Sequence, residues 1–99
     1  MRNNNLIGTW KSDPNDVITQ ENYGNVMMEF RGNGELIYTI IEKNKEQKML
    51  MTYEINGSYL ITDQSSFPQR VETEFVLDVE TGRLELIFDG ITSKYIKIN

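Results

Sequence analysis

The sequence of 99 residues contains no cysteine and no histidine. Without cysteine there are no disulfides, thiol nucleophiles or thiolate metal sites. Without either residue the chain has no Ser-His-Asp or Cys-His catalytic arrangement and none of the usual ligand sets for zinc. It also has no apolar run long enough for a signal peptide or a membrane-spanning helix. We therefore expect a cytoplasmic protein or, alternatively, the processed form of a secreted one, with no membrane insertion. Any catalysis would depend on carboxylates, lysines, tyrosines or a borrowed cofactor.

Basic residues are fewer than acidic ones, 10 against 15, and the formal net charge is -5. A surface of this sign repels nucleic-acid phosphates and anionic lipid headgroups. We expect no nucleic-acid partner, whereas a basic protein or a neutral small molecule meets no such repulsion. The length allows one hydrophobic core. We expect a flexible N-terminus over residues 1–5 and one domain over residues 6–99.

Apolar and polar residues alternate with period two from residue 25 onward, which is typical of β-strands. Turn signals recur between them, at Gly32-Asn33-Gly34, Asn56-Gly57, Thr81-Gly82 and Asp89-Gly90. About eight short strands are predicted, at residues 6–12, 25–31, 35–43, 47–55, 58–63, 69–80, 83–89 and 91–98. Eight strands can close on themselves. We expect an all-β fold, a single up-and-down antiparallel barrel in which the last strand pairs with the first.

The segment between the first two strands carries helix signals. Asp13 suits an N-cap, Pro14 suits the first helical position, and Gly24 suits the end of a helix. We expect a short helix or a compact loop that lies across one mouth of the barrel as a lid. Longer loops are expected at residues 43–48 and 63–68.

The hairpin turns predict which residues face each other. If Thr81-Gly82 is a two-residue loop, one face carries the apolar pairs Val79–Leu84, Leu77–Leu86 and Phe75–Phe88. The other face then pairs Asp78 with Glu85 and Glu74 with Asp89, so it must face water. A two-residue loop at Asn56-Gly57 pairs Tyr53 with Leu60 and Met51 with Thr62. In the second strand Val26, Met28 and Phe30 should point inward. The third strand is apolar on both faces, and either Leu36, Tyr38 and Ile40 or Ile37, Thr39 and Ile41 point inward.

Gly8-Thr9-Trp10 in the opening strand, followed by a lid and a meander of short strands, resembles the lipocalin and lipocalin-like (calycin) proteins. The turn from Phe30 to Gly34 is similar to the corresponding turn of bacterial lipocalin-like domains. The resemblance implies that Trp10 packs across the closed end of the barrel under a basic residue from near the last strand, here Lys94 or Lys97. It also implies transport or sequestration of a small apolar molecule inside the barrel, without catalysis.

Bulky apolar and aromatic side chains are predicted to line the interior. They are Trp10, Met28, Phe30, Tyr38, Met49, Met51, Tyr53, Phe75, Leu77, Leu86 and Phe88. Methionine adapts to different apolar surfaces, and a tyrosine hydroxyl, of Tyr38 or Tyr53, can orient a ligand. We predict that this set binds a small hydrophobic ligand. The alternative is that the same side chains simply fill the barrel.

An acidic stripe on the predicted outer face gives the second hypothesis. Its members are Glu72, Glu74, Asp78, Glu85 and Asp89. They are either an ordinary solvated face or a surface that docks a basic protein partner. No catalytic constellation is present, so we expect no enzyme activity, no cofactor and no metal. The protein is expected to bind a small molecule or, alternatively, to be a protein-binding module such as an inhibitor or immunity protein. It should be a monomer or weak homo-oligomer, with residues 43–48 and the third strand as the surface for self-association.

Overall fold

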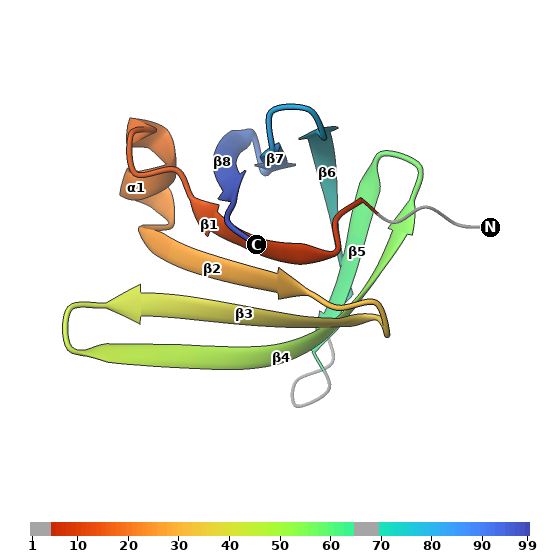
Figure 1. The fold of residues 1–99 in the computed structure, drawn as a ribbon, viewed down its shortest axis with the longest axis horizontal. Helices are drawn as coiled ribbons and strands as arrows, with labels where there is room; N and C mark the ends of the chain where they lie inside the picture. Colours follow the sequence, from red (N-terminus) through yellow and green to blue (C-terminus); the bar gives the residue numbers. More distant parts are fainter. Residues whose placement is uncertain (1–4, 65–69) are drawn as a thin grey trace.

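The computed structural model describes residues 5–64 and 70–99. Within these residues, eight antiparallel strands form a closed barrel in which each strand pairs with its sequence neighbour and β8 pairs with β1 (Figure 1). They are β1 (Gly8–Ser12), β2 (Asn25–Phe30), β3 (Glu35–Glu42), β4 (Lys45–Asn56), β5 (Tyr59–Gln64), β6 (Val71–Asp78), β7 (Arg83–Phe88) and β8 (Ile91–Lys97). One short helix, α1 (Val17–Asn22), follows β1. The predicted all-β up-and-down barrel is confirmed, and Trp10 pairs with Lys97 where the ring closes.

The barrel has two different ends, because the turns of an up-and-down sheet alternate between them. One end, called here the closed end, carries the β2–β3, β4–β5 and β6–β7 turns. The other, called the α1 end, carries α1 and the β3–β4 and β7–β8 turns; α1 packs against β8 there (Figure 1). The hydrophobic core lies between the strands. Its main cluster of buried residues consists of Leu6, Trp10, Val26, Met28, Phe30, Leu36, Tyr53, Leu60, Leu84 and Tyr95.

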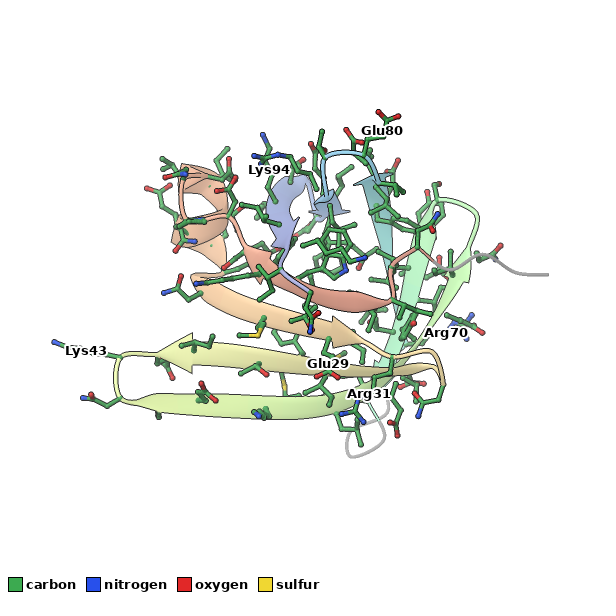
Figure 2. The ribbon with its side chains drawn as sticks, viewed as in Figure 1. Glu29, Arg31, Lys43, Arg70, Glu80 and Lys94 are labelled. Carbon is green, nitrogen blue, oxygen red and sulfur yellow. The ribbon has the colours of Figure 1, made fainter. Side chains whose placement is uncertain are left out.

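Strand β2 has the predicted faces. Val26, Met28 and Phe30 are buried, while Glu29 lies on the outer face, where its carboxylate is 3.1 Å from the guanidinium of Arg31 (Figure 2). The sequence left open which face of strand β3 points inward, and the structure decides between the two faces. Leu36 is in the core and Tyr38 packs against it, so these residues point inward.

The predicted register of the β6–β7 hairpin is wrong by two residues. Asp78 pairs with Arg83, so Leu77 faces Leu84 and Phe75 faces Leu86. The loop is longer because the Asp78 carboxylate accepts hydrogen bonds from the backbone N–H groups of Glu80 and Thr81, at 3.1 and 3.3 Å. Val79 therefore lies in the turn and is 61% exposed. The predicted acidic pairs do not form, since Asp78 faces Arg83 and Glu74 faces Ile87.

The β4–β5 hairpin differs from its prediction in the same way. Asn56 pairs with Tyr59, so the loop is Gly57-Ser58, Ile55 faces Leu60 and Tyr53 faces Thr62. The reason is that Gly57, with φ +62°, takes the first loop position, which suits a type II′ turn, whereas an Asn-Gly loop needs positive φ at both residues. Asp89-Gly90 meets that condition, with φ of 54° and 77°, and joins Phe88 to Ile91 as a two-residue loop. Both errors are even-numbered, so the residues that remain in the strands stay on their predicted faces, whereas Val79 moves into a turn.

The helix begins later than the sequence suggested. Asp16, not Asp13, is the N-cap, and its carboxylate accepts from the backbone N–H of Thr19 at 3.1 Å. The Asp13 carboxylate instead accepts from the N–H of Asn15 at 2.9 Å, which forms a turn before the helix. Gly24 ends the helix as predicted, with φ +70° and its N–H bonded to carbonyls of the last turn.

Residues 43–48 are mostly strand rather than the predicted loop. Strands β3 and β4 are joined by Lys43 and Asn44 alone, and Lys43 marks the tip of this hairpin in Figure 2. Glu42 and Lys45 face each other across the turn, with 3.6 Å between their charged groups. Asp63 and Gln64 belong to β5. The rest of the loop predicted at 63–68 and the first four residues lie outside the described residues.

Candidate functional site

A cavity of about 150 Å³ opens inside the barrel at the α1 end. Its walls come from the start of β6, the second half of β7, the middle of β8, the middle of β3 and the residue after α1. The lining residues are Tyr23, Tyr38, Val71, Thr73, Leu86, Phe88, Ser93 and Tyr95. Apolar atoms form most of the wall, and its polar atoms belong to hydroxyl groups and backbone.

The two-residue turn at Asp89-Gly90 determines how β7 pairs with β8, and these two strands form one side of the cavity. Because Phe88 pairs with Ile91, Leu86 faces Ser93 and Leu84 faces Tyr95 across β7 and β8. The Ser93 hydroxyl donates to the carbonyl of Leu86 at 3.4 Å, and this leaves its oxygen free to interact with Tyr95. Phe88 is 46% exposed and therefore lies at the mouth.

Three tyrosines share the cavity. Burial raises the pKa of Tyr38 well above its ordinary value of 10, and the nearby Tyr95 and Tyr23 raise this pKa further. Burial also raises the pKa of Tyr95, against a hydrogen bond with Ser93 that lowers it. The hydroxyls of Tyr38 and Tyr95 are therefore neutral at physiological pH and can both donate and accept a hydrogen bond.

The closed half of the barrel is filled. Trp10 is 1% exposed, its indole N–H donates to the carbonyl of Leu6 at 2.9 Å, and the ammonium of Lys97 lies 5.9 Å from the centroid of its ring. Phe30 and Tyr53 meet edge to face with centroids 5.0 Å apart. The cavity therefore does not continue to the closed end.

The structure separates the predicted ligand-binding residues into two groups. Tyr38, Leu86 and Phe88 line the cavity. The others do not line it: Trp10, Met28, Phe30 and Tyr53 are buried in the core, and Met51, Phe75 and Leu77 pack against that core. Met49 is half-buried, and its sulfur accepts from the side-chain amide of Gln64 at 3.3 Å.

Tyr53, which the sequence suggested as a residue that orients a ligand, does not line the cavity. Its hydroxyl donates to the carbonyl of Arg31 at 2.7 Å, which fixes the β2–β3 turn to β4. Of the two tyrosines proposed to orient a ligand, Tyr38 is the one that reaches the cavity.

Sequence reasoning missed five cavity residues, Tyr23, Val71, Thr73, Ser93 and Tyr95. A signal was present for four of them, since Val71 and Thr73 lie at even spacing before Phe75, which was predicted to point inward. The Asp89-Gly90 loop, once taken as a two-residue turn, places Ser93 and Tyr95 on the same face as Leu86 and Leu84. Tyr23 had no such signal, because a residue after a helix has no strand register.

Helix α1 is fixed beside the cavity through Thr19, which is fully buried. The Thr19 hydroxyl donates to the Asp16 carboxylate at 2.5 Å and accepts from the backbone N–H of Lys94, in β8, at 2.8 Å. The hydrogen bond from Thr19 lowers the pKa of Asp16 below its ordinary value of 3.8. Thr19 thus joins the helix cap to the barrel wall.

Replacing Thr19 by valine is expected to lower the free energy of unfolding by about 1–3 kcal/mol, because the shape is kept while the backbone N–H of Lys94 loses its acceptor, the buried hydroxyl of Thr19. Urea unfolding followed by circular dichroism measures this change. Thr52, exposed on β4, gives the control Thr52→Val, for which the change should stay within about 0.5 kcal/mol. Equal values for the two variants would contradict the proposed role of Thr19.

The predicted acidic stripe lies on the outside of β6, β7 and the β7–β8 turn. Arg83 faces Asp78, and Lys94 faces Glu85, so basic residues stand among the acidic ones. Figure 2 shows Lys94 and Glu80 projecting on the same side of the barrel. Within the described part of the chain, no three acidic side chains come close enough to hold a metal ion. The largely apolar cavity beside α1 is therefore the candidate binding site.

Comparison of the chain with protein-family models, with curated proteins and with solved structures found no match. Among residues 5–64 and 70–99, no helix is long and apolar enough to cross a membrane. The class of protein that the geometry defines is a closed, eight-stranded, up-and-down antiparallel barrel with a cavity at one end.

Proposed function

We propose that this protein is a non-enzymatic, lipocalin-like barrel that binds one small apolar molecule in the cavity beside α1. The observation that carries the proposal is a largely apolar cavity of about 150 Å³ inside the barrel. Among residues 5–64 and 70–99, its polar side chains are hydroxyl groups of tyrosine, serine and threonine, and neither a carboxylate nor an ammonium group lines it. Such a lining can hold and orient a molecule, but it offers no group suited to general acid–base catalysis near neutral pH.

The size of the cavity limits its ligand. Pockets for drug-sized ligands span about 300–1,000 Å³, whereas a dry apolar cavity of about 150 Å³ takes up benzene. A long acyl chain would have to enter the closed half, where Trp10, Met28 and Phe30 are packed. We infer that the ligand is about the size of one aromatic ring with a short substituent.

The lipocalin-like assignment has structural support of its own. Trp10 of the Gly-x-Trp motif sits in the strand that closes the ring, and Lys97 from the last strand lies over its indole ring. A tryptophan capped by a basic residue is what the resemblance implied. Of the two lysines considered, Lys97 takes this position, while Lys94 lies near Asp16, with 4.0 Å between their charged groups.

Titration with toluene and with hexadecanoate tests the proposal. We expect saturable binding of toluene by calorimetry with a Kd at or below about 1 mM, which corresponds to about 4 kcal/mol, and no specific binding of hexadecanoate. The variant Leu86→Trp fills the cavity and should weaken toluene binding at least about tenfold, which is about 1.4 kcal/mol.

The matched control is Val76→Trp, on the exposed face of the neighbouring strand β6, which should bind toluene like the unchanged protein. Circular dichroism verifies that both variants fold. Absence of saturation with toluene, or equal binding by Leu86→Trp, would refute the proposed site.

A further inference from the structure

The hydroxyl groups of Tyr23 and Tyr38 lack partners in the described protein. Among residues 5–64 and 70–99, neither makes a hydrogen bond, whereas the Tyr53 hydroxyl is bonded to Arg31 and that of Tyr95 interacts with Ser93. No fully buried side-chain nitrogen or oxygen in the same residues lacks a partner. The two unpaired hydroxyls therefore face space that water or a ligand can enter, and both residues line the cavity.

These hydroxyls come from different elements that border the same cavity. Tyr38 projects from the middle of β3, and Tyr23 follows α1, the helix that Thr19 fixes to β8. Because the cavity spans only about 150 Å³, one bound molecule can reach both residues. Leu86 and Phe88 belong to β7, which lies across the eight-stranded ring from β3, and they supply an apolar wall. The cavity thus offers two donors and an apolar wall suited to a ring.

We propose that the ligand is a neutral, single-ring aromatic compound whose one oxygen acceptor, of the carbonyl type, receives hydrogen bonds from Tyr23 and Tyr38. This inference rests on the proposed function and specifies its ligand class. An apolar ligand without an acceptor would displace water from both hydroxyls and leave them unpaired, which is costly in a largely apolar cavity. A carbonyl oxygen has two lone pairs and can serve both donors.

The residues that line the cavity determine which charge its ligand can carry. Within the described part of the chain, neither lysine nor arginine lines the cavity, so a carboxylate would lose its hydration without gaining a counter-ion. Neutral phenol donors compensate a carbonyl oxygen better than they compensate a full negative charge. We therefore expect an aromatic ketone to bind and the corresponding carboxylate to be rejected.

Acetophenone and α-methylstyrene provide the test, because they share the ring and the methyl group, are close in size and differ in C=O against C=CH₂. By calorimetry, acetophenone should bind at least about tenfold more tightly than α-methylstyrene, and benzoate should bind at least about tenfold more weakly than acetophenone. The double variant Tyr23→Phe/Tyr38→Phe should bring the acetophenone to α-methylstyrene ratio close to one. The control Tyr59→Phe, on the exposed part of β5, should leave the ratio unchanged.

The readout is a ratio of two affinities within one protein, so a modest loss of stability in a variant does not alter it. Equal binding of the two neutral probes by the unchanged protein would overturn this inference while leaving the proposed function in place. A ratio that persists in the double variant would also overturn it, as would tight binding of benzoate. Failure of toluene, acetophenone and α-methylstyrene alike would refute the proposed function itself.

Discussion

Replacement of Trp10 by alanine is expected to lower the free energy of unfolding by about 3–5 kcal/mol, the range for large aromatic side chains removed from a core. Trp10 is 1% exposed and lies in β1, the strand that closes the ring with β8. Its removal opens a cavity in the packed half of the barrel and leaves the carbonyl of Leu6 without its indole donor. Since domains of this size are stable by only about 5–15 kcal/mol, the variant should be marginal.

Urea unfolding monitored by far-ultraviolet circular dichroism measures the effect, since the variant has lost its fluorescent residue. A fall in Tm of at least about 12 °C should accompany it, at about 4 °C for each kcal/mol. Val79→Ala is the control, because Val79 lies in the exposed β6–β7 turn and should change stability by less than about 0.5 kcal/mol. If Trp10→Ala cost less than about 1 kcal/mol, the packing described for the closed half would be wrong.

Gly8→Ala should be the most damaging change to ring closure, at about 2–4 kcal/mol. Gly8 has φ +136°, a conformation that residues with a side chain rarely adopt. A Cβ atom there would lie 2.5 Å from the carbonyl oxygen of Asn99 and 2.8 Å from Cε of Lys97. That carbonyl cannot simply move away, because it accepts the backbone N–H of Thr9 at 2.9 Å and so joins the two ends of the chain.

Gly57→Ala is the matched control for this second prediction. Gly57 also has positive φ, at +62°, but no atom outside its immediate neighbours lies within 4 Å of the added Cβ. The expected cost is therefore the backbone term alone, about 1–2 kcal/mol. Chemical unfolding of both variants compares them, and a cost for Gly8→Ala no larger than that for Gly57→Ala would show that the contact with Asn99 is unimportant.

These two residues also explain the Gly-x-Trp motif in physical terms. Gly8 allows the chain to pass close to the C-terminal carbonyl, and Trp10, two residues later on the same face, fills the barrel beneath it. The sequence indicated the motif through its resemblance to lipocalin-like proteins. It did not indicate the reason for the glycine, because the contact is with Asn99 at the far end of the chain.

The hairpins show how far local patterns determine a sheet. Asp89-Gly90 was placed correctly, since both residues adopt the positive φ that a two-residue turn demands. Thr81-Gly82 was misplaced by two residues, because the Asp78 side chain bonds to the turn and lengthens it. The period of two nevertheless kept Phe75 and Leu77 on the inner face. Inside and outside were therefore predictable where the exact pairing was not.

The prediction of the candidate site was limited in a similar way: the face of each residue was predictable, but its exact surroundings were not. Tyr38, Leu86 and Phe88 were predicted and line the cavity, yet Trp10, Met28 and Phe30 met the same apolar criterion and fill the closed half. Burial pattern alone cannot separate a side chain that lines a space from one that occupies it. Tyr23 was missed because its position depends on how α1 packs against β8.

By itself the sequence determined the all-β class, the up-and-down order of the strands and, except in β3, the face that most alternating residues take, because periodicity and turn residues are local properties of the chain. Only the tertiary structure decided which turn residues enter the loops, which half of the barrel is filled, and that Tyr23, Tyr38 and Tyr95 meet around one cavity. Those features arise where α1, β3 and β8 come together, and no local pattern specifies how segments so distant in sequence pack.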